Sequence, residues 1–378
     1  MSERQKVLME LLQEGTLCDA VLTAAGDVHF KVRLLLLPSE YLLDTLSKHK
    51  LVRNNLQCLD LFTSHIKIIR ESKSEKPLTR TRLPPQYLLA VGGIEDSLPT
   101  DKIELYNVRN NSWVTVYKTQ KVLPEFCSAL YLGGNIYYIG GSDGDHYFSS
   151  MKRFNLATKT WQEVGPMHVA RSQASVAALR GRIYAVGGCD EFQTHSSAER
   201  FDPDTNQWTL ISPMNVARAD AGSATLHERV YVCGGFGTNE TLFTAEFYNP
   251  DTDQWTQITP MDNYRIGAGV ITYNNRLFVI GGYNGDRHTS GVSVYDPASQ
   301  TWHSVASMLH RRINFGVAVL EGQLYVAGGF HGDKKPCSRV ERYDGKNNKW
   351  HIVENMEAPR GSLSCCVVDR SSLTAANK

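Results

Sequence analysis

The sequence has no excess of charge of either sign. Its 40 Lys and Arg residues stand against 39 Asp and Glu residues, which gives a net charge of +1. Proteins whose general partner is nucleic acid or an anionic membrane usually carry a strong positive field. The balance therefore argues against both partners and allows only a local basic patch.

Long apolar runs and paired cysteines are also missing. The longest purely aliphatic run, residues 34–37, is far too short to cross a bilayer. The first 15 residues are charged and lack the apolar segment of a secretion signal. The eight cysteines show no CxxC pair and no metal-ligand spacing. We therefore expect a cytoplasmic protein with no membrane contact, no metal and no other cofactor.

What the sequence does contain is a repeat. An apolar run, a glycine pair, a loop, a strand ending in Tyr or Phe, a polar turn and a tryptophan follow one another six times. The glycine pairs are 47 or 48 residues apart, at 92–93, 140–141, 187–188, 234–235, 281–282 and 328–329. Each of the six tryptophans follows its pair by 20 or 21 residues: Trp113, Trp161, Trp208, Trp255, Trp302 and Trp350. This period is typical of repeat architectures such as propellers.

Each unit predicts four β-strands, the content of one propeller blade. The run before each glycine pair, for example residues 183–186, is rich in β-branched and aromatic residues. Upstream lies a run of small residues, such as 221–224, which suits inner strands that converge on one axis. Tyr, Phe and Trp can fill the roughly 10 Å between facing sheets. The glycine pairs allow positive φ and the close approach of a neighbouring backbone.

The two ends of the repeat region complete each other. The first unit has a strand at 87–91 but no small-residue strand before it, and residues 363–368 supply one without a partner. We predict that this C-terminal strand completes the first blade, so that no open sheet edge remains. The predicted fold is an all-β, six-bladed propeller over residues 86–369, with a tail at 370–378.

These motifs resemble the kelch-like (BTB–BACK–kelch) family over about three-quarters of the chain. The resemblance is carried most clearly by TRTRLPPQYLLAVGG at 79–93, NETLFTAEFYNPDTDQWT at 239–256 and SLSCCVVD at 362–369. It implies a non-enzymatic adaptor. In that family the BTB and BACK domains dimerise and bind cullin-3, the scaffold of a ubiquitin ligase, while the kelch propeller captures the protein to be ubiquitinated.

The first 85 residues resemble fragments of BTB and BACK, a short α/β remnant before the propeller. Residues 1–30 resemble the start of BTB, with predicted strands at 18–22 and 28–30, and residues 31–70 resemble the helical end of BACK. Residues 71–85 form a charged, proline-containing linker. We interpret the join near residues 30–31 as a deletion of most of BTB and BACK. Recognition by the propeller is then kept, whereas cullin-3 binding and dimerisation are in doubt.

An arginine follows five of the six tryptophans by ten residues. This position lies just before the inner strand, at one mouth of the channel, and the first repeat has Leu123 or Pro124 there. The family resemblance implies that these arginines bind acidic groups of a peptide, which suits a guanidinium. The residues alone also allow that each bonds loop carbonyls between adjacent blades. They are Arg171, Arg218, Arg265, Arg312 and Arg360.

The loops after the glycine pairs are predicted to line the same face. Aromatic side chains beside polar groups, on loops held by a rigid scaffold, suit the capture of a peptide. Several of these residue types also form ordinary turns. The candidate partner-binding residues are Asp143, Asp190, Phe236, Tyr283, Asn284, Phe330 and His331.

Two alternatives stay open or weak. An actin-associated or other scaffolding kelch protein would use the same fold without a ligase, and the sequence does not separate it from an adaptor. A propeller enzyme is disfavoured: no stretch matches the Asp-box of sialidases, and the predicted axis carries Ala, Gly and Ser where a copper oxidase needs Tyr and His. We predict no catalytic residue.

Overall fold

The computed structural model of the chain describes residues 20–24, 28–32, 86–118, 123–332 and 335–373. They belong to two compact units, Met1–Pro85 and Gln86–Lys378. In the first unit, β1 (Ala20–Ala24) pairs antiparallel with β2 (Val28–Val32). The predicted hairpin is therefore present, although its first strand begins two residues later than predicted. The helices predicted within 31–70 and the linker at 71–85 lie outside the described residues.

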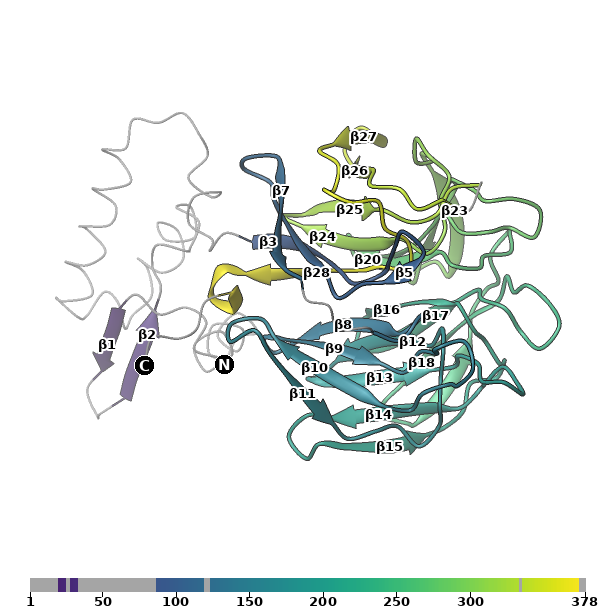
Figure 1. Cartoon of the computed structure of the whole chain (residues 1–378), viewed down its shortest axis with the longest axis horizontal. Coiled ribbons are helices and arrows are strands. Elements are labelled where there is room, and N and C mark those ends of the chain that lie inside the picture. Colours follow the sequence, from purple (N-terminus) through teal and green to yellow (C-terminus); the bar gives the residue numbers. More distant parts are fainter. Residues whose placement is uncertain (1–19, 25–27, 33–85, 119–122, 333–334, 374–378) are drawn as a thin grey trace. The chain divides into compact units, whose positions relative to one another are not determined.

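The second unit consists of six four-stranded antiparallel sheets, which confirms the predicted six-bladed propeller (Figure 1). Blade 1 contains β28 (Ser364–Asp369), β3 (Gln86–Val91), β6 (Ile103–Asn107) and β7 (Ser112–Tyr117). Blade 2 contains β8 (Ser128–Leu132), β9 (Asn135–Ile139), β10 (Met151–Asn155) and β11 (Thr160–Val164). Blade 3 contains β12 (Ser175–Leu179), β13 (Arg182–Val186), β14 (Ala198–Asp202) and β15 (Gln207–Ile211).

The remaining blades repeat this order from the axis outward. Blade 4 contains β16 (Gly222–Leu226), β17 (Arg229–Cys233), β18 (Ala245–Asn249) and β19 (Gln254–Gln257). Blade 5 contains β20 (Gly269–Tyr273), β21 (Arg276–Ile280), β22 (Val292–Asp296) and β23 (Thr301–Val305). Blade 6 contains β24 (Gly316–Leu320), β25 (Gln323–Ala327), β26 (Val340–Asp344) and β27 (Lys349–Val353). A two-stranded ribbon, β4 (Ile94–Glu95) with β5 (Leu98–Pro99), extends from blade 1, and the 3₁₀ helix η3 (Arg370–Leu373) follows β28.

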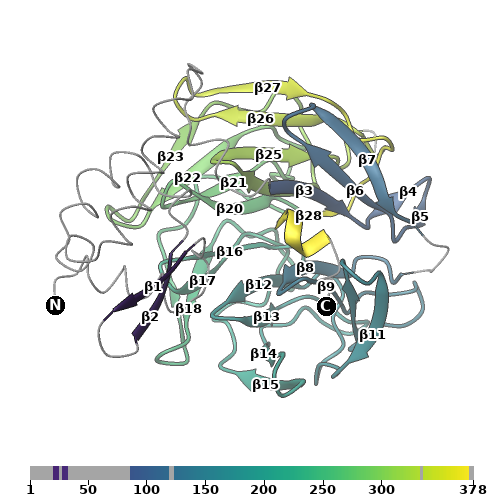
Figure 2. The same cartoon turned by 90° about the vertical axis from the view of Figure 1, so that its left-hand side faces the viewer.

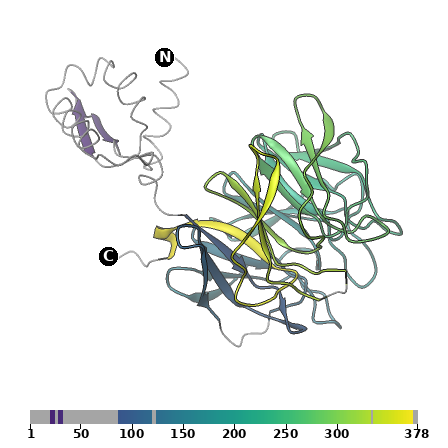
Figure 3. The same cartoon turned by 90° about the horizontal axis from the view of Figure 1, so that it is seen from above.

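The C-terminal strand closes the ring as predicted. β28 pairs antiparallel with β3 along its whole length, with Cys366 opposite Leu89. Figures 2 and 3 show the yellow C-terminal strand lying along the blue strands that begin the propeller. Blade 1 is thus built from both ends of the propeller chain, and its inner edge is covered.

Aromatic side chains fill the space between neighbouring blades. In blade 3, Phe201 and Trp208 stack with ring centroids 5.3 Å apart, and both pack in one core cluster with Ile139 and Met167 of the preceding segment. The indole Nε1 of Trp208 also donates to the carbonyl of Gly165, in the connection that enters blade 3, at 2.9 Å. Equivalent bonds to backbone carbonyls are formed by Trp113, Trp255, Trp302 and Trp350.

Removing β28 should open the propeller. Truncation after Arg360 takes away the inner strand of blade 1 and exposes the edge of β3, including the fully buried Leu88 and Leu89. We expect loss of cooperative unfolding and concentration-dependent aggregation, because an exposed apolar strand edge pairs with other chains. Thermal unfolding and size-exclusion chromatography check this. A matched truncation that removes only residues 374–378 should melt like the intact chain, and equal behaviour of the two truncations would contradict the closure.

Candidate functional site

The backbones of the five recurring arginines are bonded to the preceding blade. In Arg218 the backbone N–H donates to His195 O at 3.0 Å, and the backbone C=O accepts from Gly188 N at 2.7 Å. Both partners belong to blade 3. The same two kinds of bond fix the backbones of Arg171, Arg265, Arg312 and Arg360.

The side chains of these arginines reach into the next blade. Nη1 of Arg218 donates to the carbonyls of Gly234 at 3.0 Å and Thr244 at 2.9 Å in blade 4, and Nη2 lies 3.0 Å from Oε1 of Glu246. Each such residue therefore joins two blades. We call Arg171, Arg218, Arg265, Arg312 and Arg360 the staple arginines.

The staple arginines are buried, which corrects the prediction that they line the mouth and bind an acidic peptide. Their exposed fractions lie between 0 and 4%. Their guanidinium groups are bonded to carbonyl oxygens and, in four cases, paired with a carboxylate of the protein itself. A group without exposed surface cannot contact a partner. The alternative that the sequence left open, bonding of loop carbonyls between blades, is the arrangement in the structure.

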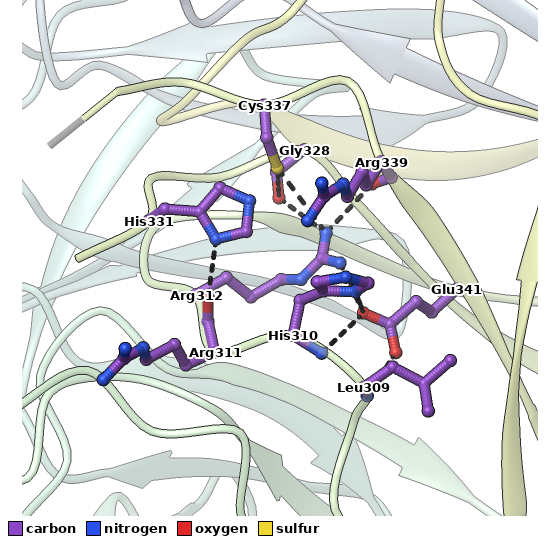
Figure 4. A network of polar contacts seen from close by, with 9 residues as sticks. All are labelled: Leu309, His310, Arg311, Arg312, Gly328, His331, Cys337, Arg339 and Glu341. Atoms are coloured by element: carbon purple, nitrogen blue, oxygen red, sulfur yellow. Dashed lines mark hydrogen bonds and ion pairs between the residues drawn. The ribbon is translucent and has the colours of Figure 1, made fainter. Parts of the chain in front are cut away.

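The partner carboxylates hold the connecting loops as well as the arginines. Figure 4 shows this at the junction of blades 5 and 6. Glu341 accepts the backbone N–H groups of Leu309 at 2.7 Å and His310 at 3.2 Å, and Oε1 lies 2.6 Å from Nη2 of Arg312. Glu104, Glu199 and Glu246 take the same place at other junctions, and all four are fully buried. Buried carboxylates are stable only when they are paired and bonded in this way.

Two junctions depart from this pattern. At the junction of blades 4 and 5 the carboxylate is replaced by Ser293, whose Oγ accepts from Nη2 of Arg265 at 3.3 Å. Burial lowers the pKa of Arg265 with no carboxylate to oppose it, whereas Glu199 opposes the same effect at Arg171. At the junction of blades 1 and 2 both members are gone. Pro124, one residue before the β-bridge between Glu125 and Ser142, stands at the arginine position, and Lys152 stands at the glutamate position.

In the five glycine pairs after the first, the first glycine makes room for a staple arginine. A Cβ atom on Gly187 would overlap the carbonyl oxygen of Arg218, and the same holds one blade earlier for Gly140 and Arg171. Gly187 also has φ of +65°, which other residues rarely adopt. The close backbone approach predicted for the glycine pairs is therefore the contact with the staple arginine.

Loss of a staple that has a carboxylate should cost more than loss of one without. Arg218→Met leaves Glu246 buried and unpaired, so we expect the free energy of unfolding to fall by about 3–5 kcal/mol. Arg265→Met removes bonds only to Gly281 O and Ser293 Oγ, and we expect a loss of about 1–3 kcal/mol. Urea denaturation of both variants measures the difference.

Ser293→Glu provides the reverse test. A carboxylate beside Arg265 should raise the free energy of unfolding by about 1–2 kcal/mol, because a bond to a charged group replaces one to a hydroxyl. In the Arg265→Met background the same substitution should destabilise. Equal losses for the two methionine variants, or a gain from Ser293→Glu that persists without Arg265, would show that the pairing does not matter.

The predicted loop residues lie on the face where the chain crosses between blades. Three of them shape their own loops: Asp143 Oδ1 accepts from His146 N at 2.7 Å, Asp190 Oδ1 from Phe192 N at 2.8 Å, and Asn284 Oδ1 from Arg287 N at 2.9 Å. These are turn contacts of the kind expected of Asp and Asn. Asp143 is exposed, and Asp190 and Asn284 are partly buried. Their use by a partner remains a prediction.

Aromatic side chains are exposed on the loops of blades 3 and 4. Phe192 is 85% exposed and the predicted Phe236 is 42% exposed. Phe243 and Tyr264 are partly exposed and stack edge to face, with ring centroids 5.2 Å apart. Aromatic groups left in water on loops are typical of binding surfaces. We call Phe192, Phe236, Phe243 and Tyr264 the aromatic patch.

A cavity of about 1120 Å³ lies between the loops of blades 5 and 6. Its lining carries four basic residues and three histidines, while Asp286 is the one acidic residue among its described lining. Arg287, Arg311 and Arg339 are exposed and form no ion pair with a described residue. We call this cavity the basic groove; its cationic and imidazole groups belong to Arg287, Arg311, Lys335, Arg339, His288, His310 and His331.

The positive charge of the groove comes from its arginines and lysine. Burial and nearby arginines lower the pKa of His288 and of His331 below its ordinary value, so that both rings are neutral near pH 7. His331 Nδ1 lies 3.1 Å from Arg311 O. Of the other predicted residues, Tyr283 lines the groove, and its hydroxyl donates to Gly285 O. Phe330 is partly buried, and its ring lies against Gly361 in the segment that leads into β28.

The sequence analysis missed most of the groove and the aromatic patch. The signal was present in the residue before each staple arginine, which is not constant among the repeats: Ala170, Ala217, Tyr264, Arg311 and Pro359. A position that recurs in every repeat serves the scaffold, whereas a position that varies beside it is free to serve a partner. Tyr264 and Arg311 could have been selected on that ground.

The fold and the site define a repeat propeller that presents its connecting loops on one face. The KLHDC2/KLHL20/DRC7 Kelch-repeats domain matches residues 78–268, just over half of the chain, and the Kelch motif matches 264–309 and 311–357. The chain belongs to the kelch-repeat family.

Individual relatives match shorter segments. The chain is 31% identical over 134 residues to Kelch-like protein 8 of Mus musculus, which is 33% of this chain and 21% of that protein. It is 30% identical over 159 residues to Kelch-like protein 21 of Danio rerio, which is 39% of this chain and 26% of that protein. The match thus spans about a quarter of these relatives or less. The solved structure of YjhT shares the fold, with a TM-score of 0.61 and 12% identity over 71% of this chain and 97% of that one.

Among the described residues, no helix has the length and apolar character needed to span a membrane.

Proposed function

We propose that the chain is a non-enzymatic, cytoplasmic protein-recognition propeller that binds an acidic segment of a partner in the basic groove. The observation that carries this proposal is the groove itself: exposed arginines without ion pairs to described residues surround a cavity on a loop face. Guanidinium groups bind carboxylates and phosphates in bidentate geometry. Leu309, which is 54% exposed at the groove, adds an apolar contact.

The aromatic patch extends the same face over blades 3 and 4. A partner that spans both regions would pair charged residues with the groove and bury apolar residues against Phe192 and Phe236. Large aromatic side chains contribute much of the binding energy in protein interfaces. The predicted residues Asp143, Asp190, Tyr283, Asn284 and His331 lie in loops beside these two regions.

Charge reversal in the groove should abolish binding of an acidic probe. Isothermal titration calorimetry with a peptide of alternating Glu and Gly should show binding to the intact chain, and its Gln–Gly counterpart should bind at least tenfold more weakly. The double variant Arg287→Glu with Arg311→Glu should lower the affinity for the acidic peptide tenfold or more, because two attractive charges become repulsive. Affinity should also fall as salt is added.

Arg109→Glu serves as the matched control. Arg109 is an exposed arginine in the turn between β6 and β7, and its reversal changes the net charge without touching the groove. The groove is not the acidic-segment site if Arg109→Glu weakens binding of the acidic peptide as much as Arg287→Glu with Arg311→Glu does. Equal binding of the acidic peptide and its Gln–Gly counterpart would lead to the same conclusion.

The role of the whole adaptor is proposed from the family. We infer from the segments 79–93, 239–256 and 362–369 a likeness to kelch-like protein 10, and this resemblance assigns the propeller to the substrate-binding part of a cullin-3 ubiquitin ligase. We expect purified cullin-3 to be retained by a fusion of residues 71–378 to an intact BTB–BACK region, and not by this chain. Co-precipitation measures this. A fusion that binds the acidic peptide but retains no cullin-3 would favour a scaffolding role without a ligase.

A further inference from the structure

An axial channel runs between the inner strands of the six blades. β8, β12, β16, β20, β24 and β28 surround a cavity of about 560 Å³ lined largely by small side chains. Several hydroxyls of its wall are bonded between blades: Ser128 Oγ donates to Ala174 O at 2.5 Å, and Ser175 Oγ donates to Ala221 O at 2.7 Å. The wall therefore offers a ligand mainly van der Waals contact.

The entrance of the channel is different. Six residues, one at the start of each inner strand, share a positive φ between 49° and 59°; these are Phe126, Gln173, Asp220, Gly267, Asn314 and Ser362. Five hydrogen bonds of 2.7–3.1 Å link them in sequence, each from a backbone N–H to the carbonyl of the preceding member. We call these six residues the entrance ring.

The entrance ring is a rigid frame for side chains. Non-glycine residues rarely adopt φ > 0, and they keep it only where the surrounding structure holds them. Here the frame sits directly beside the proposed binding face, because Asn314 is three residues beyond Arg311 of the basic groove. Ile313, between them, forms a β-bridge with Phe330, the neighbour of His331. A segment bound in the groove can therefore reach the entrance.

Asp220 is the one charged side chain among the described residues that line the channel. It forms no ion pair with any described residue, and its only polar side-chain partner is Asn314. Gly267 lies between the two. A Cβ atom on Gly267 would overlap Oδ1 of Asn314 and would lie 3.3 Å from Oδ2 of Asp220, so the absent side chain lets both oxygens converge. Burial raises the pKa of Asp220 to about 6, because the carboxylate is desolvated without a cation beside it.

We propose that the entrance ring is a subsite for a cationic side chain, lysine or arginine, of the protein bound on this face, with Asp220 and Asn314 as its acceptors. The proposal rests on the proposed function, since it needs a protein partner there. Two protein oxygens fall short of the six or more that Ca²⁺ takes, whereas an ammonium or guanidinium group has enough N–H donors to satisfy both. The volume of the channel lies within the range of ligand pockets.

The test uses small cationic probes on the intact chain. N-acetyl-lysine methylamide and N-acetyl-arginine methylamide are titrated while the backbone amide signals of Asp220 and Gly267 are followed by NMR, with N-acetyl-norleucine methylamide as the neutral probe. Both cationic probes should bind the intact chain, and D220N should weaken them at least tenfold. D145N, which removes an exposed carboxylate in a loop of blade 2, should leave both affinities unchanged.

Several outcomes would overturn the proposal. One is that the cationic probes bind D220N as tightly as the intact chain, and another is that the norleucine probe binds as tightly as the cationic probes. A third is that spermidine binds while neither amino-acid amide does, which would assign the subsite to a free polyamine. D220N removes a desolvated charge, so its thermal unfolding should show an intact fold. The alternating Glu–Gly peptide should bind D220N as it binds the intact chain. If the Glu–Gly peptide alone does not bind the intact chain, the basic groove is wrong. If the cationic probes alone do not bind it, the subsite at the channel entrance is wrong.

Discussion

The propeller depends on one interaction that recurs between its blades: an arginine whose backbone belongs to one sheet and whose side chain belongs to the next. Arg218 is held by His195 and Gly188 on one side and by Gly234, Thr244 and Glu246 on the other. Neighbouring blades also meet through side-chain packing, which is not directional, and through bonds of the tryptophan indoles, the wall hydroxyls and the entrance ring. The staple adds directional bonds and fixes how far each sheet is turned from its neighbour. It also explains why glycine stands at the first position of five of the six pairs, where a side chain would overlap the arginine carbonyl.

The junction of blades 1 and 2 shows what happens without a staple. Pro124 and Lys152 replace the pair, and the indole of Trp161 donates to the hydroxyl of Tyr117 where the other tryptophans donate to a backbone carbonyl. Among the described residues of the entrance ring, no backbone hydrogen bond joins Phe126 to Ser362 at this same junction. Contacts to the C-terminal segment take over, since Tyr131 bonds Ser372 and Val368 packs with Ile136 in one core cluster. This junction therefore depends on the tail, which couples closure of blade 1 to the stability of its neighbour.

The sequence predicted the scaffold well because the scaffold is periodic. Six glycine pairs, six tryptophans and one unpartnered strand at 363–368 are enough to give the number of blades and the way the ring closes. The same periodicity misled the choice of site. A charged residue that recurs in five of six repeats was assigned to a partner, although a partner is not six-fold symmetric and has no use for the same contact in every blade. Two adjacent residues illustrate this. Arg312, which recurs, is buried, whereas Arg311, at a variable position, lines the groove.

Near-identical blades can form an asymmetric surface only where individual blades depart from the repeat, and the departures here lie on the loop face. Blades 3 and 4 expose Phe192 and Phe236, blades 5 and 6 carry the basic groove, and the entrance ring places Asp220 on the axis. Arg265 belongs to the same set. Because Ser293 replaces the carboxylate, blade 5 keeps an uncompensated positive charge in a region of low dielectric, beside loops that are already basic. Fields from buried charges are weakly screened, so this substitution adds to the positive potential of the groove. Under the proposed function, the positive charge left at this staple would add to the attraction between the face and an acidic partner.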